Sequence, residues 1–181
     1  MLSFSKVEGN CNMDENNYQR KGVKSNTQAG RDFENVIEKF LKKNGIELER
    51  QKKIAIGINK KKDHAFDLGN DKILVECKSQ LWTKTLKSPS GKIKNWSDAM
   101  FSFYLVQGKY KKLFFVDKSI NVKKNSTLLQ YFIDKYFYLI PVDVMLIDFD
   151  SKNNDYEVYS YDEKEQTHIL KEKKELFNYI K

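Results

Sequence analysis

Three charged residues inside the hydrophobic segment HAFDLGNDKILVECKSQ (64–80) are the first candidates for chemistry: Asp67, Glu76 and Lys78. A charge at a buried strand position is costly unless it is paired or binds something. Two neighbouring carboxylates suit a hard divalent cation, which usually takes one or two protein carboxylates and keeps several waters. A lysine beside such a cation can orient or deprotonate a water and offset the charge of a phosphate. The three residue types together therefore suit metal-assisted phosphodiester hydrolysis.

The spacing of these residues predicts that they meet. The turn formers at 69–71 divide the segment into the two strands of a hairpin. Side chains alternate along a strand, so Glu76 and Lys78 share a face. A two-residue loop would place Asp67 diagonal to Glu76, about 7–8 Å away, and a four-residue loop would place the two carboxylates directly opposite each other. Every loop of even length puts all three charges on one face, whereas an unbulged loop of odd length separates Asp67 from the pair.

The simplest alternative is a structural ion pair at a sheet edge, although partly buried pairs stabilise weakly. Two residues close to the three charges are expected to have structural rather than catalytic roles. His64 is interpreted as a turn residue at the end of the basic segment KKKDH, and Cys77 as a small core residue that alternates inward.

The segment preceding the hairpin predicts an amphipathic helix. An apolar stripe follows helical spacing from Phe33 to Leu41, with a cap in the range 25–27 and Gly45 at the end. Glu34 and Glu38 are four residues apart and share a face beside this stripe. Glu34 is therefore kept as a candidate site residue, with a solvated helix charge as the alternative.

The remaining pattern predicts an α/β sandwich with a central sheet. Alternating isoleucines indicate a strand over 51–59, and KLFFVDK (112–118) is typical of a central strand. Helices are expected over 97–108, capped by Ser97, and over 125–140. The residues 143–150 and 155–162 predict a second hairpin, and 165–181 an amphipathic tail helix. The connection 81–96 is expected to be a long loop with four lysines, which contact phosphates or are merely solvated. Trp82 and Trp96, at its two ends, are expected to pack against the sheet rather than stack on bases.

Asp67 followed after nine residues by Glu76-Cys77-Lys78 resembles the signature of the PD-(D/E)XK nuclease superfamily, the restriction-endonuclease-like fold. Phe66 stands where that signature has its proline. The resemblance implies an αβββαβ core with a central mixed sheet flanked by helices, spanning about 27–117, with C-terminal α/β additions over 118–181. Residues 1–25 are interpreted as a flexible N-terminal arm, and 26–181 as a single domain.

The same resemblance implies roles for individual residues. Asp67 and Glu76 would ligate Mg²⁺, or alternatively Mn²⁺, with the main-chain carbonyl of Cys77 as a further ligand. Lys78 would position or activate the attacking water, and Glu34 would support a water or a second metal. Hydrolysis would leave 5′-phosphate and 3′-hydroxyl ends. A small member with these features most resembles a type II restriction endonuclease that acts on DNA as a homodimer, because two catalytic centres are needed to cut both strands.

Composition agrees with this expectation but does not require it. The net charge of +8 favours an anionic partner, although the abundance of Lys, Asn and Ile also fits the codon bias of an AT-rich genome. The sequence predicts no membrane span and no secretory signal, and the distant cysteines Cys11 and Cys77 indicate a cytoplasmic setting. No glycine pattern of a serine hydrolase or a nucleotide-binding protein occurs. A structure-specific nuclease, a non-catalytic nucleic-acid-binding module and a protein-interaction domain remain as alternatives.

Overall fold

A computed structural model describes residues 25–83 and 85–181, so the predicted N-terminal arm lies almost entirely outside the described residues. A seven-stranded mixed sheet forms the centre, in the order β1-β2-β3-β4-β7-β8-β9. β3, β4 and β7 run parallel, and the other neighbours in this sheet pair antiparallel. Its strands are β1 (Glu49–Ile56), β2 (Lys62–Gly69), β3 (Ile73–Lys78), β4 (Lys111–Asp117), β7 (Val144–Asp150), β8 (Asp155–Asp162) and β9 (Thr167–Lys171).

Four α-helices surround this sheet within the described part of the chain. They are α1 (Asn26–Lys43), α2 (Ser90–Leu105), α3 (Leu128–Tyr136) and α4 (Lys174–Ile180), and the 3-10 helix η1 (Phe137–Leu139) follows α3. A short separate hairpin, β5 (Ile120–Asn121) and β6 (Ser126–Thr127), lies between β4 and α3. The predicted α/β class is therefore confirmed. None of the described helices combines the length and the apolar character needed to cross a membrane.

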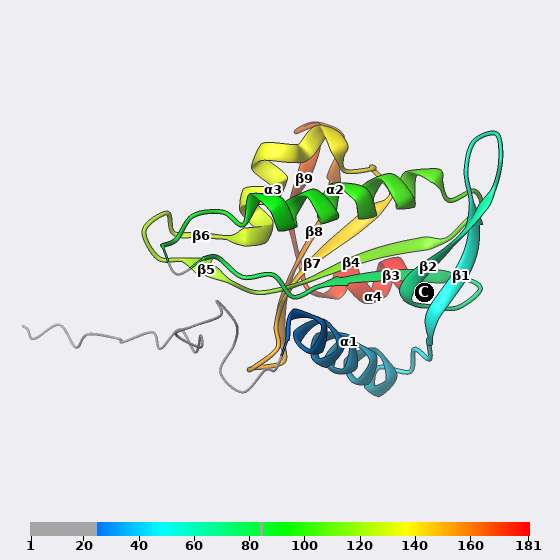
Figure 1. Cartoon of the computed structure of the whole chain (residues 1–181), viewed down its shortest axis with the longest axis horizontal. Coiled ribbons are helices and arrows are strands. Elements are labelled where there is room, and N and C mark those ends of the chain that lie inside the picture. The colour runs from blue at the N-terminus through cyan, green and yellow to red at the C-terminus, as the bar shows by residue number, and fades with distance from the viewer. Residues whose placement is uncertain (1–24, 84) are drawn as a thin grey trace, which may run out of the picture.

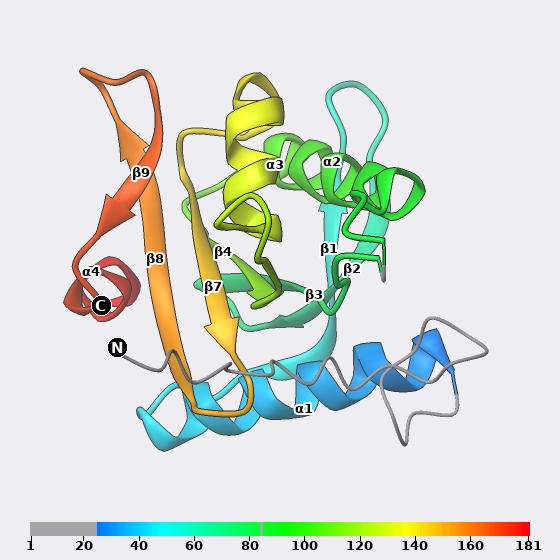
Figure 2. The ribbon, with the colours of Figure 1, turned by 90° about the vertical axis from the view of Figure 1, so that its left-hand side faces the viewer.

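The two faces of the sheet carry separate hydrophobic cores. α2 and α3 cover one face, where Trp96 and Phe132 pack against Leu74 and Phe114. α1 and α4 cover the other face (Figures 1 and 2), where apolar residues of α1 and α4 pack against β2, β3, β4, β7 and β8. A strand residue therefore faces either the α2/α3 side or the α1/α4 side, and this alternation determines which charged groups can meet.

Helix α1 forms as its sequence predicts. The Ser25 hydroxyl accepts a hydrogen bond from the Gln28 amide at 3.1 Å, which caps the N-terminus. Phe33, Ile37 and Leu41 are buried on one stripe, and Gly45 adopts a positive φ of 81° just after the end. The helix is thereby fixed along β2 and β3.

The β2–β3 hairpin has the longer of the two even-numbered loops considered above. Gly69 pairs with Leu74, and Leu68 pairs with Val75, so four residues lie between the last paired positions. The Asn70 side chain accepts hydrogen bonds from the Lys72 and Ile73 amides, both at 2.9 Å, and so stabilises the turn. This register brings Asp67 level with Glu76.

Several predicted boundaries are wrong. Helix α2 begins at Ser90 rather than after Ser97, so nearly half of the expected loop 81–96 is helical. β2 begins at Lys62, so most of KKKDH belongs to a strand rather than to a turn. The tail is not one helix, because Thr167–Lys171 forms β9 at the sheet edge and only Lys174–Ile180 is helical. The β5–β6 hairpin is not predicted at all.

Candidate functional site

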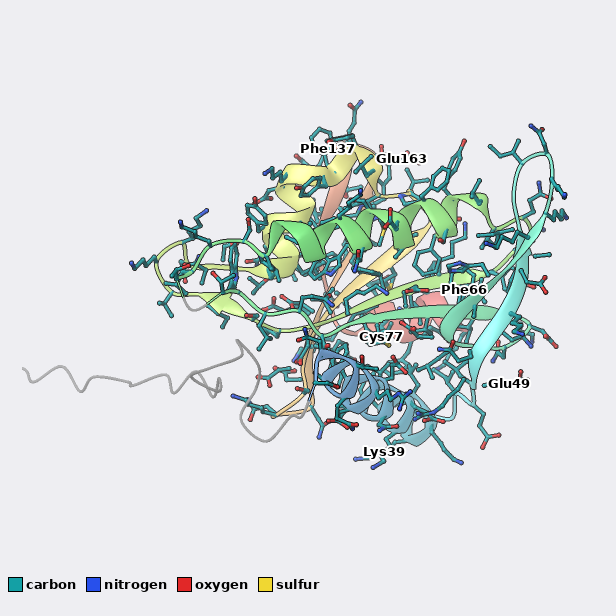
Figure 3. The ribbon with its side chains drawn as sticks, in the orientation of Figure 1. Lys39, Glu49, Phe66, Cys77, Phe137 and Glu163 are labelled. Atoms are coloured by element: carbon teal, nitrogen blue, oxygen red, sulfur yellow. The ribbon has the colours of Figure 1, made fainter. Side chains whose placement is uncertain are left out.

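The candidate site lies where β2 and β3 separate. Their paired positions end at Leu68 and Val75, and beyond that point the Asp67 carboxylate accepts a hydrogen bond from the Cys77 amide at 2.8 Å. Phe66 packs on the α2/α3 side whereas Leu68 packs on the α1/α4 side. The regular alternation assumed for this hairpin therefore breaks at Asp67. Figure 3 labels Phe66 and Cys77, which flank this break on the two strands.

Lys78 joins the two carboxylates. Its ammonium donates to Glu76 Oε2 and lies 3.8 Å from Asp67 Oδ2. Glu76 is only 5% exposed, so its charge is withdrawn from water. The structure thus brings Asp67, Glu76 and Lys78 together, with the ammonium hydrogen-bonded to Glu76 and within ion-pair distance of Asp67. Two carboxylates therefore converge on one ammonium, an arrangement that suits both a structural ion cluster and a catalytic site.

The second carboxylate leaves the cluster with excess negative charge. Burial, followed by the nearby charge of Glu76, raises the pKa of Asp67 to about 6, and the opposing effects of Lys78 and the Cys77 amide do not cancel this rise. At neutral pH, Asp67 is therefore held as an anion at a cost to folding. An additional cation beside Asp67 would relieve that cost.

Glu76 and Lys78 are both held in their charged forms. Burial acts to raise the pKa of Glu76, but the contacts with His64 and Lys78 together keep it below its ordinary value. Burial likewise acts to lower the pKa of Lys78, but the charges of Glu76 and Asp67 outweigh it and raise the pKa. Lys78 in this state is an ammonium, which suits it to stabilise negative charge rather than to accept a proton.

His64 belongs to the site, contrary to its interpretation as a turn residue. It lies in β2, and its Nε2 atom is 3.7 Å from Glu76 Oε1, slightly beyond hydrogen-bond distance. Nε2 is buried and has no hydrogen-bond partner among the described residues. The His64 ring lies edge-on to Phe66, with ring centroids 4.7 Å apart. His64 reaches Glu76 because the break at Asp67 places both on the α2/α3 side.

Glu34 and Glu38 have different contacts although they share a face of α1. The Glu38 carboxylate accepts a hydrogen bond from Arg50 Nε at 2.9 Å and ties α1 to β1. Glu34 forms no ion pair with any residue in the described ranges, but its charge contributes to the raised pKa of Asp67. The charge of Glu34 acts on Asp67 and also on Arg50, so Glu34 lies between the candidate site and β1 without a direct contact to either carboxylate of the site among the described residues.

The residues that surround the three charges have structural roles. The Cys77 thiol is buried, and burial raises its pKa well above the ordinary value, so only the main-chain carbonyl of Cys77 is a realistic oxygen ligand. Gln80 accepts a hydrogen bond from Trp96 Nε1 at 2.6 Å. Trp82 and Trp96 are buried, which confirms that they pack within the protein.

A further buried acid lies on the same face. Asp148 in β7 pairs with Val116, which in turn pairs with Lys78, so the three residues form one row across the sheet. Within the described residues, neither oxygen of the fully buried Asp148 carboxylate makes a hydrogen bond, although the Thr127 hydroxyl lies close enough to oppose the pKa rise. Burial raises the pKa of Asp148 to about 7. Neighbouring strands are about 4.8 Å apart, which separates Asp148 from Lys78 by roughly 10 Å.

The donor set fits a small divalent cation. Within the described part of the chain, no group of three or more His, Cys, Asp or Glu side chains is arranged to hold a metal. Mg²⁺ needs fewer protein ligands than that, because it usually retains waters. Asp67 and Glu76 supply two hard oxygen donors in one place, and the raised pKa of Asp67 marks an unmet need for positive charge.

Comparison of the chain with protein-family models, with curated proteins and with solved structures finds no match. The chemistry of the site must therefore be inferred from the residues that form it.

Proposed function

We propose that this chain is a Mg²⁺-dependent DNA endonuclease that hydrolyses phosphodiester bonds in a cytoplasmic setting. The observation that carries the proposal is the convergence of Asp67, Glu76 and Lys78 at the point where β2 and β3 separate. The restriction-endonuclease-like resemblance of these residues supports the same reaction. Its finer form is a type II restriction endonuclease that acts as a homodimer and leaves 5′-phosphate and 3′-hydroxyl ends.

The residues would divide the work as follows. Asp67 and Glu76 would hold the cation, with the Cys77 carbonyl as a third oxygen. Mg²⁺, when bound, supplies Lewis-acid stabilisation of the phosphate charge. The Lys78 ammonium would position the attacking water and offset the negative charge that develops on the phosphate. Glu34 would accept a hydrogen bond from a water on the α1 side.

The test is incubation of the purified chain with plasmid DNA and Mg²⁺. We expect discrete fragments that require the metal, and we expect Asp67→Asn to lower the rate by at least about 100-fold, since even outer-shell changes at metal sites typically cost 10–100-fold. Asp67→Asn keeps the side-chain shape and an oxygen for the Cys77 amide, so its folding is readily verified by thermal unfolding.

Glu34→Gln and Glu38→Gln form a matched pair for the role of α1. Both remove one carboxylate from the same helical face. Only Glu34→Gln is expected to slow cleavage, whereas Glu38→Gln loses the contact with Arg50 and lowers stability instead. A smear or nicks in place of fragments would contradict sequence-specific restriction and favour a structure-specific nuclease. Absence of cleavage under all metal conditions would refute the catalytic proposal.

A further inference from the structure

The positive charge of this chain is concentrated in two short segments. Residues 79–97 and 118–133 contain seven lysines and no Asp or Glu. The rest of the chain then holds 26 basic and 25 acidic residues, out of totals of 33 and 25. Nearly all of the net charge of +8 therefore comes from these two segments, although they make up only a fifth of the sequence. Codon bias alone would spread lysines without excluding acids from two segments.

The fold brings these segments side by side. They follow β3 and β4, which are parallel neighbours, so both leave the same end of the sheet. The Trp82 amide donates to Ser119 Oγ, and the Asn121 side chain donates to the Leu86 carbonyl, each at 3.0 Å. In Figure 1 the β5–β6 hairpin lies beside the segment that leads into α2, at one end of the long axis. Lys78, the last residue of β3, directly precedes the first segment.

Lys118 pairs with Glu157 at 2.9 Å, but other lysines of this region are available to a partner. Lys87, Lys94 and Lys123 are exposed and form no ion pair with any acid in the described part of the chain. Lys124 differs, because its ammonium lies over the rings of Trp82 and Tyr131 at 5.9 and 5.5 Å from their centroids. We call Lys87, Lys94, Lys123 and Lys124 the basic rim.

The basic rim offers charge and only one partly exposed ring, that of Tyr131. Of the aromatic residues in 79–97 and 118–133, Trp82, Trp96 and Phe132 are buried, and Tyr131 is half-buried beneath Lys124. Binding of single strands usually combines a basic groove with exposed aromatic rings on which bases stack. Contacts to the backbone of a duplex need only cations spaced along a surface.

We propose that the basic rim is a docking surface for the phosphate backbone of duplex DNA and leads the strand to Lys78. The inference rests on the proposed function only in that the DNA held there is the substrate. Asn121 stabilises the turn of the β5–β6 hairpin that carries two of these lysines, because its side-chain oxygen accepts hydrogen bonds from the Lys123 and Lys124 amides at 3.1 and 3.2 Å. The hydrogen bond from the Asn121 side chain to the Leu86 carbonyl joins the loop between β3 and α2 to the β5–β6 hairpin, so the two segments form one surface.

The test measures binding of the full chain to a labelled 30-base-pair duplex by fluorescence anisotropy in EDTA, so that cleavage plays no part. The variant Lys87→Ala/Lys123→Ala removes one exposed lysine from each segment. The control, Lys60→Ala/Lys61→Ala, makes the same charge change in the β1–β2 loop at the far end of the molecule (Figure 1). Each phosphate contact contributes about 0.9 to the steepness with which log K for binding falls against log salt concentration. Loss of two contacts therefore makes this slope shallower by about 1.8, which corresponds to roughly 60-fold weaker binding at 0.1 M salt.

We expect that loss for the rim variant and a change within about twofold for the control. Equal weakening of both variants, or none in the rim variant, would overturn the inference. Tighter binding to a single strand of equal length, or equal binding to polyglutamate, would overturn duplex DNA as the partner. Rim-dependent binding without any cleavage would refute the proposed function alone, and cleavage with rim-independent binding would refute the docking surface alone.

Discussion

Replacement of Lys78 by methionine separates the electrostatic role of this residue from its shape. The Lys78 ammonium lies 3.8 Å from Asp67 Oδ2 and in direct contact with Glu76. At an effective dielectric constant of 20, one charge pair at this distance is worth about 4 kcal/mol. Part of that is recovered because the buried ammonium no longer needs to be desolvated. Removal of one partner from a buried cluster typically costs about 3–5 kcal/mol, and we expect Lys78→Met to fall in that range at pH 8.

The cost should depend on pH in a defined direction. Without the ammonium, the pKa values of Asp67 and Glu76 rise, and that of Asp67 already stands at about 6. Between pH 4 and the raised values, the folded chain keeps protons that the unfolded chain releases, so stability falls as the pH rises through this window. The destabilisation by Lys78→Met is therefore expected to be larger at pH 8 than at pH 5.

Lys112→Met is the matched control. Lys112 is also a buried lysine of the central sheet and donates to Asp143 at 2.6 Å, but the Asp143 side chain is about half exposed. Its removal leaves a carboxylate that water can reach, so we expect a loss of about 1–3 kcal/mol that changes little with pH. Urea unfolding at both pH values measures the two losses, and plasmid cleavage is expected to disappear in Lys78→Met alone. Equal destabilisation by Lys78→Met at pH 5 and pH 8 would refute the electrostatic reasoning.

Two further predictions concern residues outside the catalytic cluster. Burial holds the pKa of Asp148 at about 7, so its ionisation costs up to about 4 kcal/mol of folding stability as the pH rises from 4 to above 7; Asp148→Asn should therefore be more stable than the parent chain at pH 8 but not at pH 4.5, and an unchanged pH profile of urea unfolding would contradict this. A Cβ atom at Gly69 would lie 2.9 Å from the Ile73 carbonyl oxygen and 3.0 Å from Lys52 Cβ. Gly69→Ala should therefore cost about 1–3 kcal/mol, whereas Gly91→Ala, in open space within α2, should stabilise by up to about 1 kcal/mol. A Gly69→Ala chain as stable as the parent in the same assay would show that the hairpin adjusts freely.

The sequence predicts those elements whose signals are local. Phe33, Ile37 and Leu41 define α1, and the turn formers at 69–71 define the β2–β3 hairpin, because each pattern lies within one element and its flanks. The length of one turn predicts the register that brings Asp67 near Glu76, whereas the break in alternation at Asp67 is not predicted. The register of this part of the candidate site lies within one hairpin of about a dozen consecutive residues, so its prediction needs no knowledge of distant contacts.

Elements that form only because they pair or pack with distant residues cannot be predicted from local sequence patterns. Residues 90–96 resemble a loop because of Gly91 and the lysines, but burial of Ile93 and Trp96 against the sheet makes them helical. The strand β9 forms because Thr167–Lys171 pairs with β8, which helical periodicity cannot reveal. His64 was missed for a related reason. Regular alternation places it on the face opposite to Asp67, and only the break in β2 brings it beside Glu76.

The hydrogen bond between the Cys77 amide and Asp67 gives the molecule a built-in reporter. Most strand amides exchange with solvent only when the ladder opens, whereas the protection of this one depends on where a single carboxylate lies. Any ion that draws the Asp67 oxygen toward itself changes the exchange rate and the chemical shift of the Cys77 amide. One NMR resonance therefore reads the occupancy of the site directly, even in variants that cleave nothing.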